Sequence, residues 1–148
     1  MNRRTFVTAV VATLAARAGH AEEAKTHIVE MVSKGARKIF EPQYLEVAVG
    51  DTVRFVNLSG THNTESVDGM IPDGVAPWKS KLKETFDLTI THAGVYGYIC
   101  TPHLSKAMVG LIVAGDPSGN LEAAKAVRVG KRADGVFEEL FTLVPDTK

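Results

Sequence analysis

Apolar and polar residues alternate in several short stretches of the first two thirds of the chain. The alternation is clearest at residues 44–49, where leucine or valine occupies every second position, and it returns at residues 52–56. A period of two predicts β-strands that bury one face. Because Gly50 and Asp51 are typical of a tight turn, these two strands are predicted to pair as a hairpin.

The same kind of pattern predicts further strands, which turn-forming residues separate. They cover residues 26–32, 39–42, 83–90, 95–99 and 109–114, and Pro42 interrupts the run that continues into residues 44–49. Roughly seven short strands without helices between them favour an antiparallel sandwich or barrel over a parallel sheet with crossover helices.

Two other regions have different patterns. Residues 57–79 are rich in Gly, Ser, Asn, Asp and Pro, which predicts a loop of about 20 residues, and loops of that length are often functional. After residue 116 the apolar positions take a helical spacing. Asn120 is placed to cap a helix over residues 121–128 that Gly130 would end, and a second apolar set spans residues 136–144. Two short helices are therefore predicted to cover one face or end of the sandwich.

The N-terminus has the pattern of a secretory signal peptide. Arg3 and Arg4 precede an uncharged apolar run at residues 5–16, and small residues follow at 19–21. A run of this length is too short for a permanent transmembrane helix. We expect residues 1–21 to be removed and residues 22–148 to form one mature domain in an oxidising compartment such as the periplasm. The arginine pair also fits a twin-arginine signal, so the export route stays open.

Removal of the signal peptide changes the net charge. The removed segment holds three of the 17 basic residues and no acidic one, so 14 basic residues remain against 17 acidic ones, a net charge of about −3. This charge excludes a nucleic-acid binder, which needs a clearly basic domain. No later segment is a membrane candidate.

One loop at residues 100–108 combines three kinds of metal donor. Cys100 offers a thiolate, His103 an imidazole and Met108 a thioether. Alone, each has a more ordinary interpretation, as a buried thiol, a surface histidine or a core methionine. Together they suit copper better than calcium or magnesium, and two histidines, one cysteine and a weak axial methionine form the ligand set of blue-copper sites. Zinc would prefer a tetrahedral set without a thioether.

The second histidine must come from elsewhere in the chain. His27 lies in the first predicted strand and His92 in a turn, so both are expected to have surface or hydrogen-bonding roles. His62 begins the long loop directly after an apolar strand, where its side chain can reach the end of a sandwich. We therefore predict His62 as the remaining ligand.

Pro102 has two predicted effects on this loop. Its ring fixes the backbone φ angle and stiffens the segment between Cys100 and Met108. It also lacks an N–H group that could donate to the sulfur. Because hydrogen bonds to sulfur stabilise the reduced site, a Pro102→Ala variant is predicted to have a higher reduction potential. An unchanged or lower potential would refute this.

Several segments resemble the pseudoazurins, a family of type 1 copper cupredoxins, across nearly the whole mature chain. The resemblance rests on residues 60–66, 70–74 and 96–103, followed by Met108. It implies a mainly β, cupredoxin-like antiparallel Greek-key β-sandwich with two short C-terminal α-helices. It also implies one copper ion, held by three equatorial ligands and one axial ligand, which are His62, Cys100, His103 and Met108 respectively. Asn63 would tie the two ligand loops together and hydrogen-bond near the sulfur.

The resemblance also implies an electron carrier and its partner. The edge of the His103 ring, between Pro102 and Leu104, would be the electron exit. Pseudoazurins typically donate electrons to a copper nitrite reductase in denitrification, so we expect a periplasmic monomer that docks transiently and does not enter the membrane. Possible docking cations are Lys34, Lys38, Lys79 and Lys106, with Lys81 and Lys83, although lysines at every second position often only mark a solvent-facing edge strand.

Two other functions remain as alternatives. A copper-delivery protein would favour open or methionine-rich ligands, whereas this chain has four methionines including the first residue. An enzyme is less favoured because four protein ligands leave no open position for a substrate.

Overall fold

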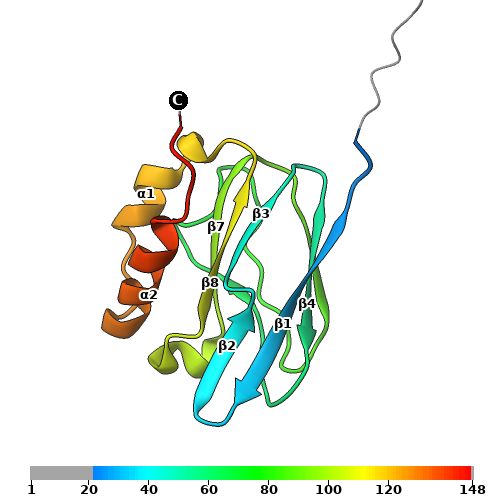
Figure 1. Cartoon of the computed structure of the whole chain (residues 1–148), viewed down its shortest axis with the longest axis vertical. Coiled ribbons are helices and arrows are strands. Elements are labelled where there is room, and N and C mark those ends of the chain that lie inside the picture. The colour runs from blue at the N-terminus through cyan, green and yellow to red at the C-terminus, as the bar shows by residue number, and fades with distance from the viewer. Residues whose placement is uncertain (1–21, 148) are drawn as a thin grey trace, which may run out of the picture.

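Two four-stranded sheets pack face to face, and two helices cover the outside of one of them (Figure 1). The computed structural model describes residues 22–147, so the predicted signal peptide lies outside the described residues. The first sheet has the order β2-β1-β4-β6 and the second the order β3-β8-β7-β5. The bounds of the first sheet are β1 Thr26–Lys34, β2 Arg37–Glu41, β4 Thr52–Asn57 and β6 Phe86–Thr89. Those of the second are β3 Tyr44–Val47, β5 Glu65–Ser66, β7 Gly94–Ile99 and β8 Val109–Ala114.

Both sheets are mixed rather than purely antiparallel. β1 pairs with β4 and β3 pairs with β8 in parallel, whereas the other strand pairs are antiparallel. The predicted hairpin between residues 44–49 and 52–56 is therefore wrong, because β3 and β4 belong to different sheets. The turn at Gly50 carries the chain between the sheets, and its N–H donates to the carbonyl of Ile90 at 2.7 Å. Alternation shows that a strand buries one face, but not which sheet it joins.

The core between the sheets is rich in aromatic side chains. The ring of Tyr98 packs edge-on against Phe40 and Phe55, with centroid distances of 4.8 and 5.0 Å. Cys100 and Met108 belong to the same buried cluster. The donor loop thus begins and ends in the buried core between the sheets.

The helical tail covers the outer face of the second sheet. α1 spans Leu121–Ala126 and α2 spans Lys131–Phe141. Phe137 and Leu140 of α2 are buried in a second cluster with Leu111 of β8, which explains why every residue of β8 is buried. The prediction of two helices is confirmed, but their bounds differ: α1 ends at Ala126 and Gly130 directly precedes α2, which starts earlier than the predicted residue 136. Asn120 does not cap α1 with its side chain, which instead exchanges two hydrogen bonds with the backbone of Val95.

The described helices do not include a membrane-spanning one. Over residues 22–147, no helix combines the length and the apolar character needed to cross a bilayer.

Candidate metal centre

The three predicted nitrogen and sulfur ligands meet at one end of the sandwich. His62 lies in the connection between β4 and β5, Cys100 directly follows β7, and His103 lies in a 3-10 turn, Thr101–Lys106, which is the yellow-green coil near the β1–β2 turn in Figure 1. Their ligand atoms all lie within 4.8 Å of one another. Among residues 22–147, no other group of three or more histidine, cysteine, aspartate or glutamate side chains is placed to hold a metal ion.

The distances between the donor atoms fit one shared ion. The Nδ1 atoms of His62 and His103 are 3.1 Å apart, and the Sγ atom of Cys100 lies 3.7 and 3.5 Å from them. Metal bonds of roughly 2.0–2.3 Å from nitrogen and sulfur bring two ligand atoms to about 3–4 Å. The three side chains therefore surround a common point without needing to move apart.

Burial sets the protonation states of these groups. His62 and Cys100 are fully buried, whereas His103 is half-buried. Desolvation lowers the pKa of both histidines. The charge of His103 lowers the pKa of His62 further, and nearby lysines lower that of His103, so both rings are neutral donors at neutral pH. Burial raises the pKa of the Cys100 thiol against the opposing effect of backbone N–H groups from Asn63 and His103. Metal binding at this thiol therefore releases a proton.

Backbone hydrogen bonds close the loop that holds Cys100 and Met108. The N–H of Cys100 donates to the carbonyl of Met108 at 2.9 Å, and the N–H of Met108 donates to the carbonyl of His103 at 3.2 Å. Pro102 is the second residue of the 3-10 turn, and Ala107 caps its end in the left-handed region with φ of 57°. Met108 is fully buried in the same core cluster as Cys100, and its backbone is bonded to both Cys100 and His103.

His62 is oriented by residues that the sequence did not reveal. Its Nε2 atom lies 3.0 Å from the hydroxyl of Ser33 in β1, and its backbone N–H donates to the side chain of Asn57 at 3.1 Å. Gly60 is required beside them, because its φ is +80° and a Cβ there would lie 2.2 Å from the Ser33 oxygen. Nothing in the sequence pattern links Ser33 to a loop almost 30 residues away.

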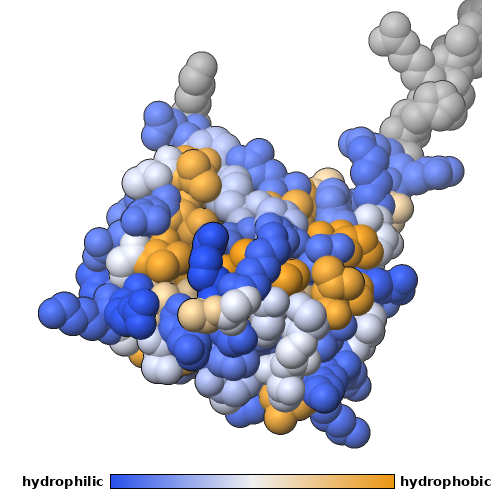
Figure 2. Space-filling view, turned by 60° about the horizontal axis from the view of Figure 1, so that its bottom comes forward, coloured by the Kyte–Doolittle hydropathy of each residue, from blue (hydrophilic) through white to orange (hydrophobic). Residues whose placement is uncertain are grey.

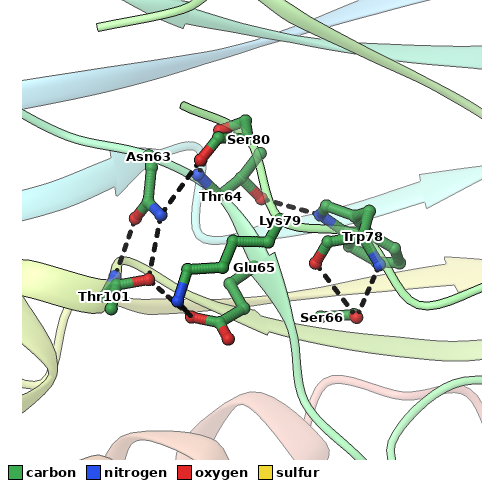
Figure 3. A network of polar contacts seen from close by, with 8 residues as sticks. All are labelled: Asn63, Thr64, Glu65, Ser66, Trp78, Lys79, Ser80 and Thr101. Carbon is green, nitrogen blue, oxygen red and sulfur yellow. Dashed lines mark hydrogen bonds and ion pairs between the residues drawn. The ribbon is translucent and has the colours of Figure 1, made fainter. Parts of the chain in front are cut away.

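Asn63 joins the two ligand loops. Its Oδ1 atom accepts the N–H of Thr101 at 2.8 Å, and its Nδ2 atom donates to the Thr101 hydroxyl at 2.9 Å and to the Ser80 carbonyl at 3.3 Å (Figure 3). Because Asn63 follows His62 and Thr101 follows Cys100, these bonds fix the separation of two donors.

The other two histidines of residues 22–147 lie away from this cluster. His27 contacts the carboxylate of Asp51 at 2.8 Å, and His92 contacts the hydroxyl of Thr91 at 2.7 Å. Both have the hydrogen-bonding roles that the sequence predicted for them.

The surroundings of His103 are basic on one side. The charges of Lys38 and Lys106 both act on the His103 ring. These two lysines line a groove between β2, the 3-10 turn and α2, together with further basic residues, Arg37, Lys131 and Arg132, and the acidic Glu139. Lys34 is paired with Glu41 at 2.8 Å. Leu104 packs against the second core cluster as a partly buried residue.

Fold and donor set together define a class of protein. A two-sheet sandwich that brings a cysteine, two histidines and a buried methionine to one end is a mononuclear copper protein of the cupredoxin class. The soft sulfur donors and neutral imidazoles of this site fit copper and its redox chemistry.

Comparisons with known proteins give the particular family. The sequence model of the copper binding proteins of the plastocyanin/azurin family matches residues 27–115. The chain is 42% identical over 112 residues to a pseudoazurin of Paracoccus pantotrophus, covering 74% of this chain and 77% of that protein. It is 32% identical over 142 residues to a pseudoazurin of Methylorubrum extorquens, covering 95% and 92%. The crystal structure of native pseudoazurin from Hyphomicrobium denitrificans superimposes with a TM-score of 0.76 at 34% identity, covering 82% of this chain and 99% of that one.

The chain therefore belongs to the plastocyanin/azurin family of copper-binding proteins, within its pseudoazurin branch. Members of this family are blue-copper electron carriers rather than enzymes.

Proposed function

We propose that His62, Cys100 and His103 are the equatorial ligands of one type 1 copper ion and that Met108 is its axial ligand. The observation that carries this assignment is the convergence of three donor atoms within 4.8 Å at the end of the sandwich. Bound copper supplies a one-electron Cu(II)/Cu(I) couple. The buried Met108, whose carbonyl accepts the N–H of Cys100, completes the set.

The protein's own part in electron transfer is to keep these donors fixed. Cys100 and Met108 are anchored to β7 and β8, and Asn63 holds the His62 loop to the Cys100 loop. Ligands that scarcely move between oxidation states allow fast transfer, whether or not the protein imposes strain. The half-buried ring of His103 reaches the surface between Pro102 and Leu104 and is the exit for the electron.

The cellular location forms part of the proposal. Residues 1–21 act as a signal peptide, and residues 22–148 are the mature copper-binding domain in the periplasm. This rests on the basic, apolar and small-residue pattern at the N-terminus. N-terminal sequencing of the protein isolated from the periplasm is expected to start at or near Glu22; a protein that retains Arg3 and Arg4 would contradict it.

The partner is a redox protein with an acidic docking surface, and a copper nitrite reductase is the candidate. The groove beside His103 gathers five basic residues on a mature chain of net negative charge. At the other end of β1, the cleft near Asp51 has Lys25 and His27 as its basic residues and is lined by three glutamates, Glu22, Glu23 and Glu46. This separation of charge would steer an acidic partner toward the copper end. Figure 2, in which that end comes forward, shows hydrophobic patches bordered by strongly hydrophilic side chains, as suits brief docking.

Electron transfer to purified copper nitrite reductase tests the partner. The second-order rate is expected to fall steeply as ionic strength rises, since exposed charges are screened beyond about 8–10 Å at physiological salt. Lys38→Gln and Lys106→Gln are expected to lower the rate and the salt dependence, whereas Lys25→Gln at the opposite end is the matched control. A rate that neither salt nor these variants change would contradict docking through this groove.

The alternative function is copper delivery. Repeated electrochemical oxidation and reduction of the copper-loaded protein separates the two functions, because a carrier retains its ion through many cycles whereas a delivery protein loses it to a chelator in one state.

A further inference from the structure

Glu65 reaches the ligand loops through one hydroxyl group. The Thr101 hydroxyl accepts the amide N–H of Asn63 at 2.9 Å and donates its own proton to the Oε2 atom of Glu65. A hydroxyl has a single proton, so its donation to Glu65 turns a lone pair toward Asn63. The amide, the hydroxyl and the carboxylate form a chain in which each bond polarises the next.

Lys79 acts on the same carboxylate oxygen. Its Nζ atom lies 3.5 Å from Oε2 of Glu65, and Figure 3 shows both side chains directed toward Thr101. The Glu65 side chain is 28% exposed, whereas that of Lys79 is 58% exposed. The ammonium group thus holds and partly neutralises a carboxylate that is itself largely shielded from water.

The backbone fixes where this pair can be. Glu65 stands opposite Ile99 in the β5–β7 pairing and opposite Lys79 in an isolated bridge. On either side, Ser66 N–H donates to the carbonyl of Trp78 at 3.0 Å and Ser80 N–H donates to that of Thr64 at 2.9 Å. Glu65 is therefore held on rigid backbone beside the strand that leads into Cys100.

From this geometry we infer that Glu65 is a positioning residue for the copper site, with Lys79 as its counterion. It holds the Thr101 hydroxyl in the orientation that Asn63 needs, and Asn63 in turn sets the separation of the His62 and Cys100 loops. The charge of Glu65 also favours the more positive oxidation state of the site, whereas the charge of Lys79 opposes it. The inference rests on the proposed ligand set, but the hydrogen-bond chain can be tested without copper.

Amide hydrogen exchange in the copper-free protein tests the hydrogen-bond chain. Glu65→Ala removes the acceptor and is expected to speed exchange of the Thr101 amide by about three- to tenfold, the range for one net hydrogen bond. Glu65→Gln keeps an acceptor oxygen and is expected to exchange near the wild-type rate. Asp87→Ala is the matched control, because Asp87 forms an exposed ion pair with Arg54 on the other sheet. A wild-type exchange rate of the Thr101 amide in the Glu65→Ala protein would overturn the positioning role of Glu65, whether or not the proposed copper ligands are correct.

The reduction potential of the copper-loaded protein tests the charges. Glu65→Gln and Lys79→Met are expected to shift it in opposite directions, upward and downward respectively, and each shift should exceed that of Asp87→Asn. Thr101→Val combined with Glu65→Ala should change the potential by less than the sum of the single changes, because both break one chain. Additive shifts, or shifts no larger than the control, would overturn the inference. A protein that binds no copper yet shows the expected exchange would instead refute the proposed function alone.

Discussion

His62 is the residue whose place in the site depends most on the fold. Cys100, His103 and Met108 share one loop, so their proximity could be predicted from the sequence alone. His62 could be selected among three histidines because it directly follows an apolar strand, and the structure brings its Nδ1 atom to 3.1 Å from that of His103. Ser33 and Glu65 could not be predicted, since side chains that orient a ligand through one hydrogen bond leave no pattern in a sequence.

Loss of the Ser33 hydroxyl is expected to weaken metal binding. Ser33→Ala leaves the Nε2 atom of His62 without its side-chain partner, and removal of such an outer partner typically costs 10–100-fold in metal affinity. Competition with a chelator of known affinity measures the change. Ser118→Ala, at an exposed position in another part of the chain, is the control. Equal affinities of Ser33→Ala and the wild type would show that the hydroxyl does not orient the ring.

Among the elements, the connection between β7 and β8 consists of a turn that the sequence predicts and, at its end, a left-handed Ala107 that the sequence does not predict. Pro102 and the surrounding polar residues predict a turn, and the structure has a 3-10 turn there. The left-handed conformation of Ala107 was not predicted, because alanine normally avoids it. The ladder between β7 and β8, together with the bond from Cys100 to Met108, fixes both ends of this connection, and Ala107 closes it in the left-handed conformation.

Ala107→Gly is expected to stabilise the protein. A left-handed alanine costs roughly 1–2 kcal/mol, of which glycine would recover part because of its own entropic cost of about 0.5–1 kcal/mol. Chemical denaturation should therefore show a gain of up to about 1 kcal/mol. The reverse change is the matched control: Gly35 has φ of +60° and open space around it, so Gly35→Ala should lose a similar amount. A destabilised Ala107→Gly protein would contradict the assignment of strain.

The architecture of the whole molecule is set by the division of the strands between two sheets. Local sequence patterns do not predict this division. Alternation identified β3 and β4, but tertiary pairing placed them in opposite sheets. Asp51 stabilises the turn that carries the chain from one sheet to the other. Its carboxylate accepts the N–H groups of Lys25 and Ala48 and contacts His27. It joins the chain entering β1 to the turn that links the two sheets.

Because of these hydrogen bonds, the stability of the fold should decrease at low pH. The N–H of Lys25, then His27 and the N–H of Ala48, lower the pKa of Asp51 from 3.8 to about 2. A lowered native pKa means that this contribution is complete above about pH 4 and is lost as the pH falls through about 2. The Asp51→Asn protein should be less stable than the wild type at pH 7. It should also lose less stability than the wild type as the pH falls from about 4 to about 2. Denaturation curves of both proteins at several pH values measure this; parallel pH profiles would contradict it.

Titration of the mature, copper-free protein with Cu(II) is the decisive test of a type 1 copper site at His62, Cys100, His103 and Met108. Cu(II) is expected to produce an intense blue absorption that saturates at one copper ion per chain and disappears reversibly on reduction. Cys100→Ser and His62→Ala should stay folded by circular dichroism yet lose the blue colour. A colourless complex, or a blue complex that persists without Cys100 or His62, would contradict this assignment of the ligands.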